Sequence, residues 1–323
     1  MAALADYRPP ALVDLRQVTS GWLEPLLEEE IREWRRELDW DYRPSADLVR
    51  RFVRMQSLLG YALVADDRVL GYGYYVNEEH KGLLGDVYLM AEHRSAANES
   101  RLLAALIQAL AATLPIERVE AQLMLWRDRA GRDLPLGGKL RRFHRLFMMA
   151  ELKAPFAPPA GESAPISYRH WQERDHEAAG RLIAAAYRGH VDSDINDQYR
   201  TPGGARRFLS NIVQYPGCGS FFQPGSMVAA EQATNNLAGI SLSSLVAFDI
   251  GHITQICVAP AWRGRKVGWN LLCRSLRELA QAGCRRASLT VTASNTQAIR
   301  LYERLGFRVH REFDAYVWDG LRG

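Results

Sequence analysis

The sequence predicts a mixed α/β (α+β) protein made of two related halves, each containing strands and helices. Two observations support this fold class. Apolar stretches that alternate as strands do are interleaved with amphipathic stretches of helical period. The chain also repeats itself: Arg94 and Arg263 lie 169 residues apart (263 − 94) in similar surroundings. At this shift "DVYLMAEHRSAANESRLLAAL" lies over "QICVAPAWRGRKVGWNLLCRS", and each stretch is typical of a strand, a basic turn and a helix.

The segment "KAPFAPPAGESAP", residues 153–165, is rich in Pro and Ala and interrupts any regular pattern. We interpret it as a linker between two domains. The predicted domains are therefore residues 1–152 and residues 166–323, which are halves of similar size.

Length and composition restrict the class of protein. A chain of 323 residues with 47% apolar and 24% charged residues is sufficient for two soluble globular domains. The net charge of +4 permits an anionic ligand but does not indicate a nucleic-acid-binding protein. No apolar run reaches the roughly 18 residues of a membrane helix, and the N-terminus has no signal-peptide pattern. The four cysteines lack disulfide or metal-ligand spacing, so we expect buried thiols in a cytoplasmic protein.

Within residues 166–323, the order of elements follows from the apolar period and the turn residues. Helices are expected at 172–187, 204–213, 267–282 and from Asn295 to the glycine at 306. Strands are expected at 166–171, 226–231, 237–248, 251–258, 285–291, 307–313 and 315–318.

The stretch "CVAPAWRGRKVGWNLL" has the layout of an anion-binding turn, because an apolar strand leads through a basic, glycine-bearing turn into a helix. Gly264 and Gly268 would let backbone N–H groups approach an anion, while Arg263, Arg265 and Lys266 would add positive charge. We expect Lys266 to keep a helical, negative-φ backbone, with its side chain outside the turn or on a phosphate. The alternative for the whole turn is a solvated basic helix start.

Two motifs resemble the GNAT superfamily of acyl-CoA-dependent N-acyltransferases, and the resemblance covers about residues 166–318. The first is "RGRKVG", residues 263–268, after "VAP"; Lys266 replaces the central glycine of the family pattern. The second is "NTQAIRLYERLGF", residues 295–307, which contains every element of the family's Asn…Ala…Tyr…Gly-Phe pattern. The resemblance implies tandem domains with mostly antiparallel sheets flanked by helices. It also implies direct acetyl transfer from acetyl-CoA to an amine in a ternary complex.

The resemblance assigns roles to particular residues. Tyr302 matches the family tyrosine that protonates the departing thiolate, although it could equally be a core residue of its helix. A backbone N–H at residues 256–258 would stabilise the oxyanion. Asn295 matches a coenzyme A contact, and helix capping is its alternative role. The residues expected to contact the cofactor are Ile256, Cys257, Val258, Arg263, Gly264, Arg265, Lys266, Val267, Gly268, Trp269 and Asn295.

The general base is less closely specified. Family members often place a Glu on the strand before the turn, and His252 holds that place here. A histidine can accept a proton from an ammonium group directly or through water. Regular alternation would put His252, Thr254 and Ile256 on one face of the strand and Ile253, Gln255 and Cys257 on the other. A structural histidine is the alternative, and Glu231 on the neighbouring strand is the reserve candidate.

The acidic connection "HVDSDINDQY", residues 190–199, has the first spacings of a calcium loop but lacks the glycine and the final glutamate. We therefore predict no metal site. In the family this connection borders the acceptor site, where acidic side chains would attract a cationic amine. A solvated polar loop is the alternative.

The first half is predicted to have lost the cofactor site. At the 169-residue shift, Ser95, Ala97 and Glu99 replace Gly264, Lys266 and Gly268, and Phe143 is the best counterpart of Tyr302. The expected partner is a small-molecule or peptide amine, with no nucleic acid or membrane. The chain would be a monomer with an internal pseudo-dimer, or a homodimer. Two alternatives stay open: a non-catalytic acyl-CoA-binding regulatory module and a tandem-fold aminoacyl transferase.

Overall fold

The computed structural model describes residues 9–126, 134–153, 156, 165–215 and 217–322, which form two compact units. Unit 1 comprises residues up to 37, 42–143 and 313–323; unit 2 comprises residues 38–41 and 144–312. These bounds differ from the expected halves at the last strand of each half. Residues 144–151, in the last strand of the first half, belong to unit 2, and residues 313–319, in the last strand of the second half, belong to unit 1. Most of the expected linker, 154–155 and 157–164, lies outside the described residues.

Unit 1 contains a six-stranded sheet in the order β1-β2-β3-β4-β5-β13, in which β4 and β5 are parallel and the other neighbours antiparallel. Its elements are β1 (Ala11–Asp14), α1 (Ser20–Leu38), α2 (Arg43–Arg54), β2 (Gly60–Ala65), β3 (Arg68–Glu78), β4 (Lys81–Leu89), α3 (Ala96–Ala112), β5 (Arg118–Gln122) and the end of β13 (Arg308–Asp319).

Unit 2 contains a sheet in the order β6-β12-β11-β10-β9-β7, and the short strand β8 also pairs with β10. Again one neighbouring pair, β11 and β12, is parallel. Its elements are β6 (Leu140–Glu151) from residue 144, β7 (Ile166–His170), α4 (His176–Ala186), α5 (Asp192–Ile195), α6 (Pro202–Gln214), β8 (Ser220–Phe221), β9 (Met227–Glu231), β10 (Leu237–Ala247), β11 (Ile250–Val258), α7 (Val267–Gln281), β12 (Arg286–Thr292) and α8 (Thr296–Arg304).

The internal repeat is confirmed at the expected register. Adding 169 to the bounds of β4, residues 81–89, gives residues 250–258, which are the bounds of β11. The same shift carries the 3₁₀ turn at 91–93 onto the 3₁₀ turn at 260–262. In both units the strand before this turn is parallel to the strand after the following helix. The predicted mixed, mostly antiparallel sheets are therefore confirmed.

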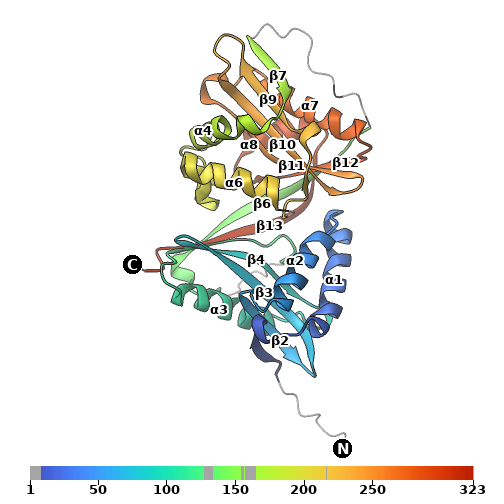
Figure 1. Cartoon of the computed structure of the whole chain (residues 1–323), viewed down its shortest axis with the longest axis vertical. Helices are drawn as coiled ribbons and strands as arrows, with labels where there is room; N and C mark the ends of the chain where they lie inside the picture. The colour runs from blue at the N-terminus through green and yellow to red at the C-terminus, as the bar shows by residue number, and fades with distance from the viewer. Residues whose placement is uncertain (1–8, 127–133, 154–155, 157–164, 216, 323) are drawn as a thin grey trace, which may run out of the picture. The chain divides into compact units, whose positions relative to one another are not determined.

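Helices cover both faces of the unit 2 sheet (Figure 1). On one face, α7 and α8 pack against β11 and β12 through buried side chains such as Leu276, Leu289 and Phe307. On the other face, α4 and α6 pack together and against β9 and β10, with Ile183, Leu209 and Ile240 in the contact. Burial of such side chains is the dominant favourable contribution to folding.

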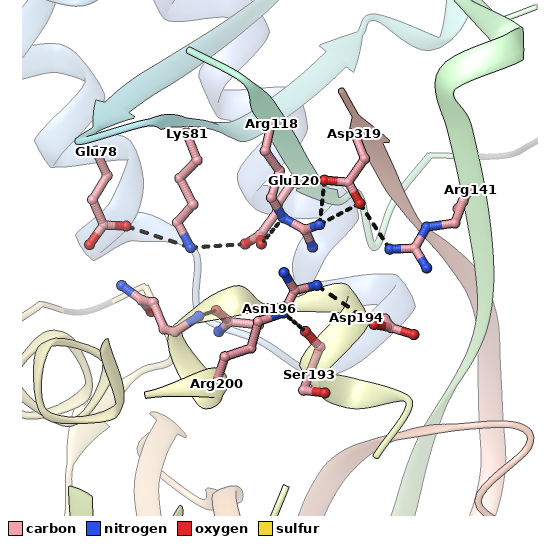
Figure 2. A network of polar contacts seen from close by, with 11 residues as sticks. Glu78, Lys81, Arg118, Glu120, Arg141, Ser193, Asp194, Asn196, Arg200 and Asp319 are labelled. Atoms are coloured by element: carbon pink, nitrogen blue, oxygen red, sulfur yellow. Dashed lines mark hydrogen bonds and ion pairs between the residues drawn. The ribbon is translucent and has the colours of Figure 1, made fainter. Parts of the chain in front are cut away.

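A buried ion network joins strands β4, β5 and β13 within unit 1 (Figure 2). Glu120 accepts hydrogen bonds from Lys81 at 3.1 Å and from Arg118 at 2.7 Å. Arg118 also reaches Asp319 at 2.7 Å. Because Lys81, Arg118 and Glu120 are nearly inaccessible to solvent, removal of one partner would weaken the compensation of a buried charge. The network therefore fixes the end of β13 in unit 1.

Three expectations about cysteines, metals and membranes can be compared with the described residues. Cys257, Cys273 and Cys284 are buried as expected, but Cys218 is exposed, so that part of the prediction is wrong. Among the described residues, no cluster of His, Cys, Asp or Glu suited to a metal ion is found. No helix in the described ranges has the length and apolar character needed to span a bilayer.

Candidate active site

Strands β11 and β12 separate halfway along their length. Their parallel pairing runs from Ile250↔Arg286 to Ile253↔Leu289 and then stops. Beyond that point, β11 stays paired with β10 up to Val258, and β12 stays paired with β6 up to Thr292. The backbone edge of residues 254–258 that faces β12 is therefore left without a strand partner, at the place where the resemblance predicts the cofactor.

A β-bulge at Thr254 changes which face each side chain of β11 occupies. Leu242 is opposite Gln255 and Ser243 is opposite Ile253, so Thr254 is skipped in the pairing register with β10. The expected regular alternation is therefore wrong. Ile253 and Ile256 both pack on the α7 and α8 side, whereas Cys257 packs on the α4 and α6 side. Because Thr254 is an extra residue in the strand, the side chains after it lie on the opposite faces from those that regular alternation would give.

Two backbone N–H groups of β11 face the opening. The hydroxyl of Tyr187, at the end of α4, donates to the carbonyl oxygen of Ile256 at 3.3 Å. The N–H and C=O of one residue in an antiparallel strand point to the same edge, so the Ile256 N–H also faces the opening. Val258, two residues on, has the same orientation, whereas Ala259 donates to β10. Of residues 256–258, Ile256 and Val258 thus offer donors suited to an oxyanion.

The turn before α7 uses two left-handed residues. Gly264 has a φ of +73° and Lys266 a φ of +60°. The expectation that Lys266 keeps a negative φ is therefore wrong. This position requires the left-handed region, in which glycine is unstrained and a side chain costs roughly 1–2 kcal/mol. Lys266 therefore adopts the backbone conformation that suits the family glycine, and the turn carries the resulting strain.

The start of α7 is shaped for an anion. Lys266 is the N-cap residue and makes no capping hydrogen bond with its side chain, so the first N–H groups of the helix have no partner within it. A Cβ atom built on Gly268 would lie 3.4 Å from Val258 Cγ2, an ordinary contact. Packing within the protein therefore does not require glycine here. A bare, partly exposed backbone at a helix start fits the pyrophosphate of coenzyme A.

The basic side chains of the turn do not all point to the start of α7. Arg263 donates a hydrogen bond to the carbonyl oxygen of Ala186 at 2.6 Å and so caps the end of α4. Arg265 lies over the ring of Trp262, with its guanidinium carbon 5.1 Å from the ring centre. Arg304 covers the ring of Trp269 in the same way at 5.0 Å. Arg263 is thus engaged in holding α4 and the turn together.

Tyr302 lies on α8 and is 7% exposed. Its ring packs in the core against Phe307 at 6.1 Å, so the expected core role is present. Burial raises the pKa of Tyr302, the negative charge of Asp192 raises it further, and Arg145 opposes this effect. The phenol therefore stays protonated at neutral pH, as a proton donor must.

Asn295 caps α8, because its side-chain oxygen accepts a hydrogen bond from the Ala298 N–H at 3.2 Å. This bond fixes the orientation of the amide. The amide nitrogen lies 3.3 Å from His190 Nε2. The capping role expected as an alternative is therefore confirmed, while a contact with coenzyme A stays a prediction.

The acidic connection, which the sequence predicted only as a whole to border the acceptor, brings Asp192 against Thr292 and His190. The Asp192 carboxylate accepts a hydrogen bond from the Thr292 hydroxyl and lies 3.5 Å from Arg145. Its second oxygen is 3.8 Å from His190 Nδ1. Arg145 comes from β6, more than forty residues before Asp192 in the sequence, so only the folded sheet brings the two together.

Arg200 holds the backbone around Asp192 (Figure 2). Its Nε donates to the carbonyl oxygen of Ser193 at 2.9 Å, and its terminal nitrogen lies 3.6 Å from Asp194. Tyr187 and Tyr199 stack with their ring centres 4.6 Å apart beside this segment. The connection is therefore helical and partly buried rather than the solvated loop that was the alternative, and its place beside the acceptor stays a prediction.

The two candidate bases lie elsewhere in unit 2. His252 is 6% exposed, and its Nδ1 is 2.9 Å from the Ser288 hydroxyl. Trp40 and Phe147 enclose it, and burial lowers its pKa to about 4. Glu231 ends β9 and accepts a hydrogen bond from Thr234 in the following turn at 2.5 Å. Neither is among the charged groups that shift the pKa of Tyr302.

Unit 1 fills the corresponding helix start with its own side chains. Ser95 caps α3 by accepting a hydrogen bond from the Asn98 N–H at 3.2 Å. Glu99, in the first turn of α3, is 2% exposed. A buried carboxylate at this end of the helix takes the electrostatic place of an anion. Phe143 lies on strand β6 rather than on a helix, so its expected correspondence to Tyr302 is wrong.

The sequence of this chain is similar to those of known acetyltransferases. Residues 193–307 match the family model described as "Acetyltransferase (GNAT) family". A mycothiol acetyltransferase from Acidimicrobium ferrooxidans is 26% identical over 273 residues, which cover 81% of this chain and 83% of that protein. Another, from Saccharopolyspora erythraea, is 31% identical over 87 residues, but these cover 27% of this chain and 29% of that relative.

Two solved structures share the fold over nearly the whole chain. A GCN5-related N-acetyltransferase from Sphaerobacter thermophilus has a TM-score of 0.67 at 21% identity, covering 97% of this chain and 96% of its own. A tandem GNAT protein from the clavulanic acid biosynthesis pathway has a TM-score of 0.61 at 15% identity, covering 96% and 98%. Fold, motifs and family model agree: the chain has the fold of GNAT acetyltransferases, and its residues 193–307 match the model of that family.

Proposed function

We propose that this protein transfers an acetyl group from acetyl-CoA to an amine by direct attack in a ternary complex within unit 2. One arrangement carries the proposal: the uncapped start of α7, the opening between β11 and β12, and the buried phenol of Tyr302 belong to one compact unit. A module that only bound acyl-CoA would not need a proton donor beside the opening. Tyr302 therefore favours the enzyme over the binding module.

The chain's own residues would divide the work as follows. The backbone from Gly264 to Trp269 would hold the pyrophosphate, with Lys266 and Arg265 adding positive charge. Acetyl-CoA supplies the acetyl group as a thioester, which an amine attacks. The N–H groups of Ile256 and Val258 would stabilise the oxyanion, and Tyr302 would give its proton to the departing sulfur. Asn295 and Cys257 would line the cofactor's path.

Deprotonation of the amine has two candidate bases, His252 and Glu231. The low pKa of His252 and its core position argue against a large role, and Glu231 is engaged in a turn. An amine can also lose its proton to water before it binds, so this step does not require a strong base.

The relatives support a small-molecule acceptor. The two relatives compared above are both named mycothiol acetyltransferase, and one aligns with most of this chain. We therefore propose an amine on a small polar molecule, with mycothiol-type precursors among the first to test. A peptide amine is the second choice.

The experiment is a panel of amines incubated with acetyl-CoA, with release of the coenzyme A thiol as readout. We expect amine-dependent thiol release by the wild type and its loss in Tyr302→Phe. Absence of amine-dependent release across small-molecule and peptide acceptors would remove the proposal. Thiol release that Tyr302→Phe leaves unchanged would retain the enzyme but remove the role of the phenol.

A further inference from the structure

Two carboxyl groups lie together in the core of unit 1. Glu30, on α1, has no exposed surface, and Asp86, on β4, is 5% exposed. The phenol of Tyr72, on β3, donates a hydrogen bond to Glu30 Oε2 at 2.9 Å. Asp86 accepts hydrogen bonds from the Tyr42 hydroxyl at 3.2 Å and from the Val87 N–H at 2.7 Å. The two groups therefore connect α1, the start of α2 and two strands of the sheet.

The second oxygen of Glu30 has no donor while both carboxyl groups are ionised. Glu30 Oε1 is buried and accepts no hydrogen bond from any residue in the described ranges. Within the same ranges, no ion pair with Lys, Arg or His reaches Glu30 or Asp86. The other groups that face the pair are the Tyr74 phenol and the Trp34 indole, which are both neutral. Two adjacent carboxylates without a cation are an arrangement that a protein core disfavours strongly.

A proton on Glu30 Oε1 removes both difficulties, because a carboxylic acid has a donor and no charge. Burial raises the pKa of Glu30 well above its ordinary value, and the charge of Asp86 and a hydrogen bond with Asp86 raise it further. Burial also raises the pKa of Asp86, but the hydrogen bonds from Glu30, the Val87 N–H and Tyr42 oppose this effect. Glu30 is therefore the acid of the pair, and Asp86 is the carboxylate that accepts its hydrogen bond.

Glu33, one turn further along α1, shows the usual alternative. It is 4% exposed and accepts hydrogen bonds from Arg94 at 3.1 and 3.0 Å and from the Tyr88 hydroxyl at 2.9 Å. Burial raises the pKa of Glu33, but the bonds from Arg94 and Tyr88 outweigh this effect and hold it below the ordinary value. Two buried glutamates of one helix thus differ in charge because only Glu33 has a cation.

The pair lies at a position of unit 1 that corresponds to the opening in unit 2. The pairing of β3 with β4 skips Gly85, and adding 169 to this number gives 254, the position of the bulge in β11. At the same shift Val87 corresponds to Ile256, whose N–H is proposed to stabilise the oxyanion. In unit 1 the Asp86 carboxylate already accepts the hydrogen bond of this donor. Unit 1 therefore fills the counterpart of the acyl site with its own side chain.

We propose that Glu30 and Asp86 share a single proton at neutral pH, and that this proton is a pH-sensitive link that holds α1 on the sheet of unit 1. The inference concerns unit 1 and does not depend on the chemistry proposed for unit 2. Loss of the proton would leave two carboxylates facing each other in the core and would remove the hydrogen bond between α1 and β4. Unit 1 would therefore become less stable as the pH rises.

The direction of this pH dependence follows from proton binding. In the unfolded chain Glu30 has its ordinary pKa of about 4.5 and is ionised at neutral pH, whereas the folded chain keeps the proton. Folding then takes up one proton, so stability is fully present below about pH 4.5 and falls as the pH rises through the folded pKa. The unfolding constant should change by about tenfold for each pH unit, which is the slope of one proton.

The charge state is tested by infrared spectroscopy of the full chain at pH 7. A protonated carboxylic acid absorbs separately from carboxylates and amides, so its band reports the shared proton. The proteins are the wild type, Glu30→Gln and Glu33→Gln. Glutamine at residue 30 has the same shape, can accept from Tyr72 and can donate to Asp86 without titrating. Glu33 is the matched control, since it is a buried glutamate of the same helix that has a cation.

We expect the acid band in the wild type and in Glu33→Gln, and its loss by one group per chain in Glu30→Gln. A band of equal strength in the wild type and Glu30→Gln, or no band in the wild type, overturns the inference. The wild type alone gives a second readout, because the band should disappear when the chain is unfolded by heat at the same pH. A band that persists in the unfolded chain contradicts the shared proton.

The link is tested by urea unfolding at pH 6, 7 and 8, read by pulsed hydrogen exchange of peptides from α1 so that unit 1 is followed by itself. The ratio of the unfolding constants of the wild type and Glu30→Gln should rise about tenfold per pH unit, while the ratio for Glu33→Gln should stay constant. Groups that titrate equally in both proteins, His252 included, cancel in each ratio. A constant ratio for Glu30→Gln would show that no proton is held there.

Discussion

The hydroxyl of Thr292, at the end of β12, donates a hydrogen bond to the carboxylate of Asp192, in the connection between α4 and α6. This bond ties a strand that borders the opening to the acidic connection between α4 and α6. Asp192 in turn acts on the phenol of Tyr302. One carboxylate therefore both contacts the strand beside the opening and raises the pKa of the phenol proposed as the proton donor.

Tyr302→Phe is expected to lower kcat by about 10²–10⁴-fold, because the substitution removes only the proton donor. The Phe ring fills the same core position, so the free energy of unfolding and the affinity for acetyl-CoA should change little. Steady-state kinetics and calorimetry measure the two effects separately. A kcat within threefold of the wild type would show that the thiolate leaves without this proton.

Gly268→Glu is expected to abolish acetyl-CoA binding, because it puts a carboxylate where Glu99 lies in unit 1. Gly268→Ala is the matched control, since its Cβ makes an ordinary contact with Val258. Calorimetry of the wild type should give one site per chain. Two equivalent sites, or unchanged binding by Gly268→Glu, would contradict the assignment of the cofactor to unit 2 alone.

Lys266→Gly is expected to raise the free energy of unfolding by about 0.5–1 kcal/mol. Glycine removes the strain of a left-handed backbone, which exceeds the extra entropy that glycine loses on folding. Lys266→Ala keeps the Cβ atom and should bring no gain. Denaturant unfolding compares the three proteins, and a Lys266→Gly protein no more stable than Lys266→Ala would argue against strain at this residue.

Because His252 is buried, we expect the free energy of unfolding to fall in mild acid. Its folded pKa is about 4, below the unfolded value of about 6.5, so the unfolded chain binds the proton more readily. Stability should be fully present above about pH 6.5 and should fall on the order of 3 kcal/mol as the pH drops towards 4.

His252→Gln removes the titrating group while keeping a polar side chain beside Ser288. Its unfolding free energy should depend less on pH between 4 and 6.5 than that of the wild type. The same variant tests the proposed base, because loss of the low-pH limb of kcat/KM in His252→Gln would indicate proton transfer by this residue. An unchanged profile would make it a structural residue.

The sequence was informative wherever the signal is local or periodic. The 169-residue repeat aligned β4 with β11 residue for residue, because both strands precede the same basic turn. The motif at 295–307 placed Asn295 at a helix start and Tyr302 on its buried side. These features depend on contacts within a few residues, which a single sequence records.

What the sequence could not predict depends on contacts between distant segments. The bulge at Thr254 becomes visible only in the pairing of β11 with β10. Arg145 meets Asp192 because β6 pairs with β12, and nothing in the local sequence of either residue indicates this. The left-handed Lys266 was missed because lysine rarely adopts that backbone, so the residue type argued against the conformation it has.

The most direct test of the account follows both products of one reaction. Purified protein, acetyl-CoA and a responsive amine are incubated together, and released thiol and acetylated amine are quantified by mass spectrometry over time. Direct transfer with Tyr302 as proton donor predicts equal amounts of the two products from the wild type and only trace amounts of either from Tyr302→Phe. Thiol released without acetylated amine, or equal amounts of both from the two proteins, would contradict it.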